Sequence, residues 1–285
     1  MKILSIPLLA HDASICILKN GAITSYQMEE RFSRIKHDLN FDYVLDNLKD
    51  TFFDKIIITQ HFLENYTYSL EKVKEKIQNL SYKELIIEEE RHHLYHAYSG
   101  FYNSGFEEAV CFSVDASGAI LNSGDIEIES IYHLRRNQEE IQLFQRTREF
   151  KPIKENSSFW KYISSLDEKN LSVGELYQKI SSKFNYNPVD GAGKIMGLAQ
   201  YKNYKEKLQY PYNSKEWKHR VDEAYYLQRN TQNHILSLIK KYTEETGIKN
   251  VVISGGYGLN CVANYHYLKN LKDINLYVDP ICFDA

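Results

Sequence analysis

The sequence predicts an α/β protein built from two similar lobes. Three observations lead to this expectation: apolar runs of strand length alternate with helical patterns, one strand–turn–strand pattern occurs twice, and a late apolar strand runs into paired glycines and a helix. The 285 residues, 43% of them hydrophobic, suffice for a sizeable core and indicate one large domain or two of ordinary size.

The first third of the chain reads as short strands followed by helix–strand alternation. Strands are predicted over 2–6 and 14–19, and Asn20-Gly21 leads into a third strand over 22–27. Asn-Gly between two apolar runs indicates a hairpin, because both residues tolerate a positive φ. Further elements are expected as a helix near 41–49, a strand over 55–59, a helix near 66–79, a strand over 85–89 and a helix from about 91.

The opening pattern recurs after residue 108. Residues 109–134 again place an apolar strand before Asp-Ala-Ser, followed by a polar turn and further strands. Asp12-Ala13-Ser14 and Asp115-Ala116-Ser117 are therefore candidate equivalent positions in an internal duplication. The predicted lobes are residues 1–107 and 108–285, with the functional site between them.

A helical stretch is expected inside the second lobe, after about residue 150. The predicted helices cover 171–184, 191–200 and 217–247. The apolar run 251–256 then ends in two glycines and is followed by a helix over 258–270 and a strand over 276–278. Strand, glycine pair and helix in this order are typical of a parallel sheet that binds its ligand at the carboxyl end of the strand.

Charge, cysteine usage and hydropathy exclude several classes of protein. The 35 basic and 38 acidic residues nearly balance, so no global field attracts nucleic acid or a membrane surface. The four cysteines are far apart and lack CxxC spacing, so we expect thiols in a reducing compartment. The apolar start is too brief for a signal peptide, and no segment approaches the ~20 apolar residues of a membrane span. A cytoplasmic protein is therefore expected.

Three histidines within five residues form a candidate metal site. On a helix, His92 and His96 lie one turn apart and share a face, so their imidazoles can bind one metal ion. Asp115, at the end of a buried strand, would add a carboxylate oxygen, whereas His93 would point away as a supporting residue. The alternative is that these histidines only cap or line a helix surface.

Two polar segments of the first lobe are candidates for binding an anion. The turn His11-Asp12-Ala13-Ser14 can offer backbone N–H groups to phosphate oxygens, or His11 as a general base toward a hydroxyl. The charged run 29–38 brings Arg31, Arg34 and Lys36 close together for an anionic substrate. A simple polar turn and a solvated loop are the respective alternatives.

Glycine spacing marks two candidates in the second lobe. Gly191-Ala192-Gly193-Lys194 predicts a helix start that favours an anion, or else close helix packing, although its spacing fits neither the phosphate-loop nor the dinucleotide consensus. After the strand at 251, Gly255 and Gly256 let the backbone approach a flat nucleoside, with Asn260 to hydrogen-bond it. A tight turn without a ligand is the alternative there.

Seven ordered blocks of the sequence resemble those of one enzyme family. They are HDASICILKNGAI, EERFSRIKHD, HHLYHAYSGFY, VDASG, GELYQKISSKF, GKIMGLA and GGYGLNCVAN. In this order and spacing the chain resembles, over essentially its whole length, the O-carbamoyltransferases of nodulation-factor and antibiotic tailoring. The resemblance implies duplicated ribonuclease H-like lobes of the actin, sugar kinase and heat-shock ATPase type, related to the tRNA threonylcarbamoyladenosine synthase subunit.

The resemblance also implies an activity, the transfer of a carbamoyl group from carbamoyl-adenylate to a substrate hydroxyl. In such enzymes a YrdC-like domain makes the adenylate from carbamoyl phosphate and ATP, and the amino-terminal part binds it together with a metal, typically Fe²⁺. Carried over to this chain, the catalytic residues are His11 as base and Lys36 at the carbamoyl or phosphate end. The implied metal ligands are His92, His96, Asp115 and Asp284, and Gly255, Gly256 and Asn260 would line the nucleoside site. The predicted cofactor-binding residues also include Asp12, Ser14, Arg31 and Lys194, from the candidate anion-binding segments.

The end of the chain departs from the family pattern. The sequence stops at Ala285, within the Asp-Ala-Gly turn that supplies Asp284, so an incomplete second lobe and no YrdC-like domain are expected. We therefore expect a complementary chain that carries this domain, or a homo-oligomer, and no synthesis of carbamoyl-adenylate by this chain alone. The alternatives are a non-catalytic nucleotide-binding remnant or subunit, and tRNA threonylcarbamoylation, for which the near-neutral charge gives no RNA-binding signature.

Overall fold

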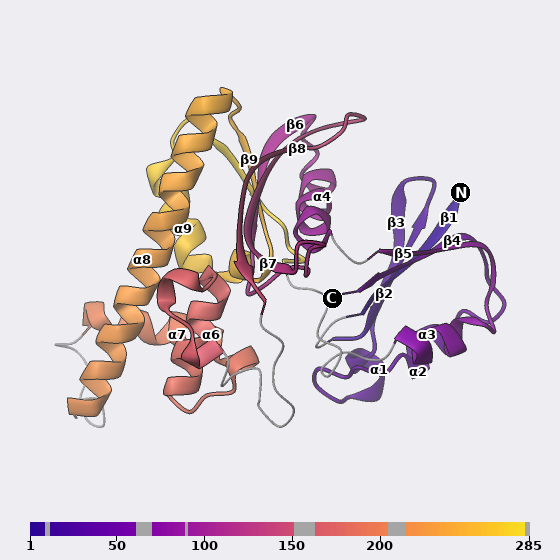
Figure 1. The fold of residues 1–285 in the computed structure, drawn as a ribbon, viewed down its shortest axis with the longest axis horizontal. Helices are drawn as coiled ribbons and strands as arrows, with labels where there is room; N and C mark the ends of the chain where they lie inside the picture. The colour runs from indigo at the N-terminus through magenta and orange to yellow at the C-terminus, as the bar shows by residue number, and fades with distance from the viewer. Residues whose placement is uncertain (9–11, 61–69, 89–90, 151–162, 205–214, 283–285) are drawn as a thin grey trace. The chain divides into compact units, whose positions relative to one another are not determined.

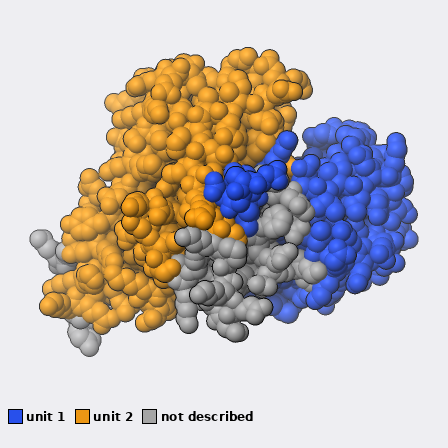
Figure 2. Space-filling view, viewed as in Figure 1, with its two compact units in different colours: residues 1–92, 118–125, 283–285 blue, residues 93–117, 126–282 orange. Residues whose placement is uncertain are grey.

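The computed structural model describes residues 1–8, 12–60, 70–88, 91–150, 163–204 and 215–282. The chain forms two compact units (Figure 2), the first made of residues 1–92 with 118–125 and the second of residues 93–117 with 126–282. The change from one unit to the other falls in the first turn of a helix that starts at His92, ahead of the predicted lobe boundary after residue 107.

The first unit is a mixed sheet with strand order β3-β2-β1-β4-β5 (Figure 1). β1 pairs antiparallel with β2 and parallel with β4, which in turn pairs parallel with β5. The elements are β1 (Lys2–Leu8), β2 (Ser14–Lys19), β3 (Ala22–Met28), α1 (Glu30–Ser33), α2 (Asp42–Asp46), β4 (Phe52–Gln60), α3 (Leu70–Ile77) and β5 (Ser81–Glu88).

The hairpin between β2 and β3 is the one that the sequence predicts. Asn20 and Gly21 connect the strands, with φ of 53° and 81°, so both residues adopt the left-handed region that this dipeptide tolerates. Every second residue of β1 is fully buried, from Leu4 through Ile6 to Leu8. These side chains pack with residues of α2 and α3 into one apolar core, so the two short helices cover one face of the sheet.

The second unit contains a sheet of order β10-β9-β6-β7-β8 and a larger set of helices. Its strands are β6 (Glu108–Val114), β7 (Asp125–Arg135), β8 (Ile141–Glu149), β9 (Asn250–Ser254) and β10 (Asn275–Val278). Its helices are α4 (His92–Ser104), η1 (Glu168–Asn170), α6 (Val173–Lys183), α7 (Pro188–Gln200), η2 (Tyr201–Tyr204), α8 (Lys215–Thr246), η3 (Gly256–Leu259) and α9 (Cys261–Asn270).

The two sheets have the same topology. Read from β8, the second sheet is β8-β7-β6-β9-β10, which matches β3-β2-β1-β4-β5 strand for strand. In each sheet the first strand along the chain is central, pairs antiparallel with the next one and parallel with the fourth. The predicted duplication of two α/β lobes is therefore confirmed.

β6 is buried on both faces because helices lie on either side of it (Figure 1). Val110, Phe112 and Val114 point into a core shared with α6, α7, α8 and α9. The alternating residues Ala109 and Cys111 point the other way, onto α4. A strand covered on both faces reads as a continuous apolar run, which is how it appears in the sequence.

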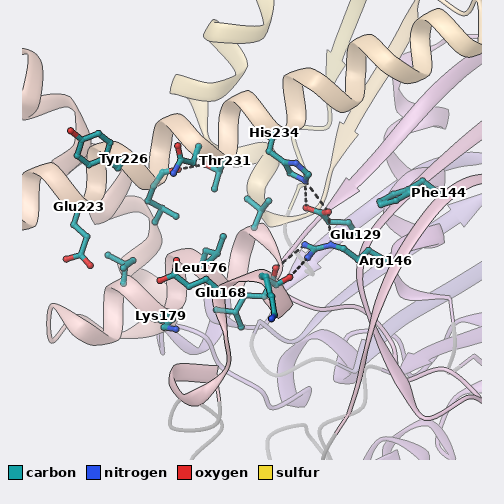
Figure 3. A pocket seen from close by; sticks show the side chains of 16 residues that line it. Glu129, Phe144, Arg146, Glu168, Leu176, Lys179, Glu223, Tyr226, Thr231 and His234 are labelled. Atoms are coloured by element: carbon teal, nitrogen blue, oxygen red, sulfur yellow. Dashed lines mark hydrogen bonds and ion pairs between the residues drawn. The ribbon is translucent and has the colours of Figure 1, made fainter.

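A buried carboxylate ties the helical layer to the sheet (Figure 3). Glu129 on β7 is 2% exposed and accepts from Arg146 of β8 at 3.1 Å and from His234 of α8 at 3.2 Å. Burial alone would raise the pKa of Glu129, but the His234 hydrogen bond and the Arg146 charge outweigh it and lower the pKa below its usual range. Glu129 is therefore an ionised anchor in the apolar layer.

Two expectations from the sequence are corrected by the structure. The helix predicted to begin at Gly191 begins at Pro188, because proline lacks the N–H that the first turn leaves unsatisfied and has a helical φ already. The charged run 29–38 is only partly solvated, since Glu29 is fully buried and accepts from the backbone N–H groups of Tyr43 and Val44 at the start of α2.

Within the described ranges, no helix, α8 included, is long and apolar enough to cross a membrane.

Candidate functional site

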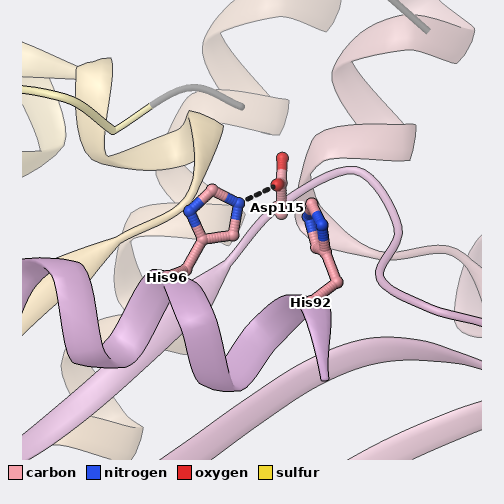
Figure 4. Close-up of side chains that lie close together, drawn as sticks. All are labelled: His92, His96 and Asp115. Carbon is pink, nitrogen blue, oxygen red and sulfur yellow. Dashed lines mark hydrogen bonds and ion pairs between the residues drawn. The ribbon is translucent and has the colours of Figure 1, made fainter. Parts of the chain in front are cut away.

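The three predicted metal ligands His92, His96 and Asp115 come together at the start of α4 and the end of β6 (Figure 4). Each offers one ligand atom, and these atoms all lie within 4.8 Å of one another. His96 is 9% exposed, and its Nε2 lies 3.0 Å from Oδ2 of Asp115. The reading of the histidines as a mere helix surface is thus not supported, since His96 is turned into the protein.

His93 lies on a different face of α4, as predicted. It is fully buried, and its Nδ1 is 2.9 Å from the hydroxyl of Ser130 on β7. Its backbone carbonyl accepts from the hydroxyl of Ser113 on β6 at 2.6 Å. These contacts fix the first turn of α4 against the sheet and so determine where His92 and His96 stand.

The carboxylate of Asp115 is held by backbone groups. Its Oδ1 accepts from the N–H of Ala116 at 2.7 Å and from the N–H of Gly256 at 3.3 Å. The other oxygen, Oδ2, is the one that faces His96. The backbone therefore orients one oxygen, and the second lies against the histidine.

The first turn of α6 contacts the backbone that carries Asp115. The N–H of Gly174 donates to the carbonyl of Asp115 at 3.2 Å, and the hydroxyl of Ser172 donates to the carbonyl of Ala116. A Cβ on Gly174 would lie only 2.5 Å from the nitrogen of Ala116, so this approach requires glycine. Ser172 also forms a capping box with Glu175, whose carboxylate is bound by Arg148 at 2.8 Å through both terminal nitrogens.

The predicted glycine turn borders the same carboxylate. Gly255 follows β9 with φ of 82°, and a Cβ there would lie 2.6 Å from the carbonyl oxygen of Val114. This close approach to the end of β6 is what brings the N–H of Gly256 to Asp115. The turn thus has a structural purpose, and its contact with a nucleoside stays a prediction.

The donor set fits a divalent metal ion. Two donors that bind one ion at about 2.1 Å and about 90° to each other are about 3.0 Å apart. The 3.0 Å between His96 Nε2 and Asp115 Oδ2 is the length of their hydrogen bond and is also compatible with one shared ion. The His92 ring lies beside the same carboxylate in Figure 4. Imidazole nitrogens with a carboxylate oxygen suit Zn²⁺, Fe²⁺ or Mn²⁺ and do not distinguish among them. Asp284, the predicted fourth ligand, lies outside the described residues.

Asn260 lies in a buried polar network next to the glycine turn. It is fully buried, and its amide donates to the hydroxyl of Tyr177 at 3.2 Å and to Gln228 at 3.0 Å. Its side-chain oxygen accepts from the N–H of Ala263 and so caps α9. The network continues from Tyr257 to Thr231 at 3.3 Å. In this structure Asn260 fixes the turn and α9 from inside, and a hydrogen bond from it to a nucleoside stays a prediction.

The other predicted residues of the second lobe are spread along α7. Lys194 is exposed in the middle of the helix, with its ammonium 5.2 Å from the centre of the Tyr186 ring. Gly191 packs against Ser181 of α6, where a Cβ would lie 2.5 Å from the serine Cβ. The glycine at 191 thus serves close helix packing, the alternative interpretation of this segment. Whether Lys194 meets a nucleotide stays a prediction.

The predicted residues of the first unit lie just before and at the start of β2, on α1 and in the loop after α1. Asp12 is 6% exposed with φ of 63°, Ser14 starts β2 and is buried, and Arg31 and Lys36 are exposed. His11, the predicted base, lies outside the described residues.

Sequence reasoning missed one partner of Asp12. His37, also at positive φ (58°), places its Nδ1 2.9 Å from Oδ1 of Asp12, while its backbone N–H donates to Glu30 at 3.2 Å. Asp12, Glu30 and His37 thus form a second group with ligand atoms within 4.8 Å of one another. In the sequence, His37 stands inside a run that otherwise looks like a charged loop, and nothing local pairs it with Asp12.

Comparison with known proteins identifies distant relatives whose names assign no activity. The chain is 24% identical over 345 residues to an uncharacterized protein of Synechocystis sp. and 26% identical over 289 residues to an uncharacterized protein of Methanocaldococcus jannaschii. These matches cover 99% and 96% of this chain but 55% and 53% of the relatives. The chain therefore spans about half the length of the curated relatives it matches. No protein-family model matches it.

Among solved structures, the chain is similar to full-length HypF in its phosphate- and nucleotide-bound form. The TM-score is 0.54 with 13% sequence identity, over 99% of this chain and 53% of HypF. At this identity the likeness concerns the fold. Together with the two matching sheets, it confirms the predicted fold of two duplicated α/β lobes.

Proposed function

We propose that this chain is the metal- and nucleotide-binding part of a carbamoyl-transfer enzyme, which moves a carbamoyl group from carbamoyl-adenylate to a substrate hydroxyl. The observation that carries the proposal is the cluster of His92, His96 and Asp115 directly beside the Gly255–Gly256 turn. The seven sequence blocks shared with O-carbamoyltransferases support it. The fold shared with HypF, a protein solved with phosphate and nucleotide, supports nucleotide binding.

In this proposal His92, His96 and Asp115 hold a divalent metal, with Asp284 as the fourth ligand. When bound, the metal supplies Lewis-acid chemistry, which stabilises negative charge on a phosphate or carbonyl oxygen. The chain's own contribution is positioning: two backbone N–H groups and the first turn of α6 hold Asp115 before any ligand arrives. Such preorganisation avoids the free-energy cost of arranging the site during the reaction.

Proton transfer is proposed for the first unit. His11 would take the proton of the acceptor hydroxyl, and Lys36 and Arg31 would attract the anionic end of the adenylate. Asp12, Ser14 and Lys194 are proposed to contact the nucleotide as well. We further propose that a complementary chain or domain of the YrdC-like type supplies carbamoyl-adenylate.

Metal content of the purified chain tests the proposal. We expect near-stoichiometric divalent metal after anaerobic purification, iron being the expected element, and its loss in His92→Ala and in His96→Ala. His219→Ala is the matched control, because this exposed histidine on α8 lies outside the cluster. Wild-type protein without metal under these conditions, or metal retained in both cluster variants, would contradict the proposed site.

Transfer itself is tested with carbamoyl-adenylate supplied from outside. The metal-loaded chain should bind the adenylate and release AMP when a panel of sugar, nucleoside and polyketide alcohols is added. Binding of the adenylate without transfer to any alcohol would reduce the function to nucleotide binding. Failure to bind adenylate at all would overturn the assignment.

A further inference from the structure

One face of the first sheet has no apolar layer packed on it among the described residues. On β1, Leu4, Ile6 and Leu8 point into the core with α2 and α3, so the residues between them point to the opposite face. The middle row of this open face, followed across the five paired strands, is Tyr26, Cys16, Ser5, Ile57 and Ile86. All five side chains are only partly buried, and none belongs to an apolar core within the described ranges.

The equivalent face of the second sheet is covered by α4 (Figure 1). Its matching row, followed across β7, β6, β9 and β10, is Tyr132, Cys111, Val252 and Tyr277. Leu94, Ala97 and Phe101 of α4 pack on this row. Gly100 allows the close approach, because a Cβ there would lie 2.6 Å from the side chain of Val252. The second sheet is therefore covered on both faces and the first sheet on one.

The side chains of the open face suit a helix. Ser5 and Cys16 at the centre of the row are small, and the larger Tyr26 and Ile57 flank them. In the covered row of the second sheet, Cys111 on the central strand is likewise small. Small central side chains leave room for the convex surface of a helix. Five strands about 4.8 Å apart span about 19 Å, which is about the length of a 13-residue helix such as α4.

The duplication indicates where such a helix belongs along the chain. α4 directly follows β5, the last strand of the first sheet, and packs on the second sheet. Its equivalent would follow β10, the last strand of the second sheet, and pack on the first sheet. The two curated relatives have room for such a helix, because the matches cover only 55% and 53% of their lengths.

We infer that the open face of the first sheet binds an α-helix supplied from outside residues 1–285, which packs there as α4 packs on the second sheet. The contact side of this helix carries small and apolar residues, spaced as Leu94, Ala97 and Phe101 are in α4. Its source is the sequence that the longer relatives carry outside their match to this chain. Docking of the helix does not depend on the proposed carbamoyl transfer.

Methyl NMR of the full chain tests the inference. The probe is the part of the Methanocaldococcus jannaschii relative that lies outside its match to this chain. We expect the probe to shift the methyl signals of Ile57 and Ile86 on the open face. The signals of Ile56 and Ile58, which point into the core from the same strand as Ile57, should stay in place. No shift on the open face would overturn the inference, as would equal shifts of all four residues.

A second copy of the chain is the competing occupant. Light scattering of the chain without the probe measures its mass, and dilution shows whether the Ile57 and Ile86 signals depend on concentration. A dimer whose formation shifts these two signals would place a second copy on the open face and overturn the inference. Signals that are independent of concentration leave the face open for the helix, as we expect.

Lysine substitutions locate the helix. Ile57→Lys places a charge in the middle of the open face and should weaken binding of the probe about tenfold or more, because the docked helix would bury an unpaired ammonium. Ile86→Lys, on the edge strand of the same row, should weaken it as well and replaces Ile57→Lys if that variant does not fold. The matched control is Ile141→Lys on β8, an exposed isoleucine of the other sheet, which should leave the affinity unchanged. Wild-type affinity in both Ile57→Lys and Ile86→Lys would exclude the open face as the docking site.

Discussion

At Asp115 one carboxylate serves two purposes with two different oxygens. Oδ1 is fixed by backbone N–H groups, so it orients the side chain, while Oδ2 faces His96 at 3.0 Å. Asp12, its candidate equivalent in the first lobe, likewise faces a histidine, His37, at 2.9 Å. In each lobe an acid that follows the first strand along the chain is thus paired with an imidazole, although the histidines come from different elements.

Asp115→Asn separates these two purposes. Asparagine keeps an oxygen that can accept from Ala116 and Gly256, so the fold should be retained, but it presents an uncharged amide to the metal position. We expect metal affinity to fall by more than the roughly 10–100-fold that loss of an outer hydrogen-bonding partner costs. Competition of the protein with a chelator for Zn²⁺ measures this, with urea unfolding as the control. Unchanged affinity would show that Asp115 does not bind the metal.

Glu129 gives a prediction about pH and stability. Because its pKa is lowered in the folded protein, its contribution is fully present above the unfolded value of about 4.3 and is lost as the pH falls through the lowered folded pKa. Glu129→Gln should therefore destabilise the protein by about 1–3 kcal/mol at neutral pH. The difference in the free energy of unfolding between wild type and Glu129→Gln should shrink below about pH 4.3. Urea unfolding from acid to neutral pH tests this, and a difference that stays constant would refute it.

At the scale of elements, the contact of α6 with the Asp115 backbone depends on one glycine. Gly174→Ala would push the first turn of α6 away from Ala116 and displace the metal ligand, lowering metal affinity roughly 10–100-fold. The matched control is Gly193→Ala in α7, where a Cβ meets nothing within 4 Å and should stabilise the helix by up to about 1 kcal/mol. Titration with metal measures the metal affinity of both variants. Equal affinities would show that α6 does not position Asp115.

The turn after β9 permits a similar comparison. Gly255→Ala combines a positive φ with a clash against the carbonyl of Val114, whereas Gly124→Ala has a similar φ of 85° but open space around its Cβ. We expect Gly124→Ala to cost about 1 kcal/mol and Gly255→Ala clearly more, because the strand end must also move. Chemical unfolding of both variants measures the difference. Equal losses would mean that φ alone accounts for the glycine.

Elements that depend on local signals could be predicted from the sequence. The strand over 14–19 and its Asn-Gly turn are found as predicted, because turn chemistry and alternating burial are local. The start of α7 differs from the predicted Gly191, because Pro188 and not the glycine spacing determines its first turn. Contacts between distant segments could not be predicted. No local feature distinguishes the buried Glu29 from its solvated neighbours. No local feature indicates that Glu129 contacts His234, more than a hundred residues later in the chain.

The candidate site could be predicted in part for the same reason. His92 and His96 share a helix face, which spacing alone determines, and Asp115 ends the next strand along the chain. The roles of Ser172 and Gly174 could not be read from sequence, because they act on Asp115 from an element more than fifty residues away. The sequence predicts that Asn260 faces a ligand, whereas the structure shows it as a buried cap of α9. Asparagine suits both roles, so the residue type alone does not distinguish them.

At the scale of the molecule, each unit has its own sheet and apolar core, and the metal cluster is held by α4 and the end of β6. Metal binding should therefore stabilise the units unequally. A ligand present at 100 times its Kd stabilises the folded state that binds it by about 2.7 kcal/mol. This stabilisation appears as slower amide exchange wherever opening releases the metal.

We expect Zn²⁺ to protect the amides of α4 and β6 and to leave those of β1 and β4 unchanged. Hydrogen exchange with and without Zn²⁺ measures this, with Asp115→Asn as the control that should show no protection. Uniform protection of both sheets would mean that the two units open together, and protection that persists in Asp115→Asn would place the metal elsewhere.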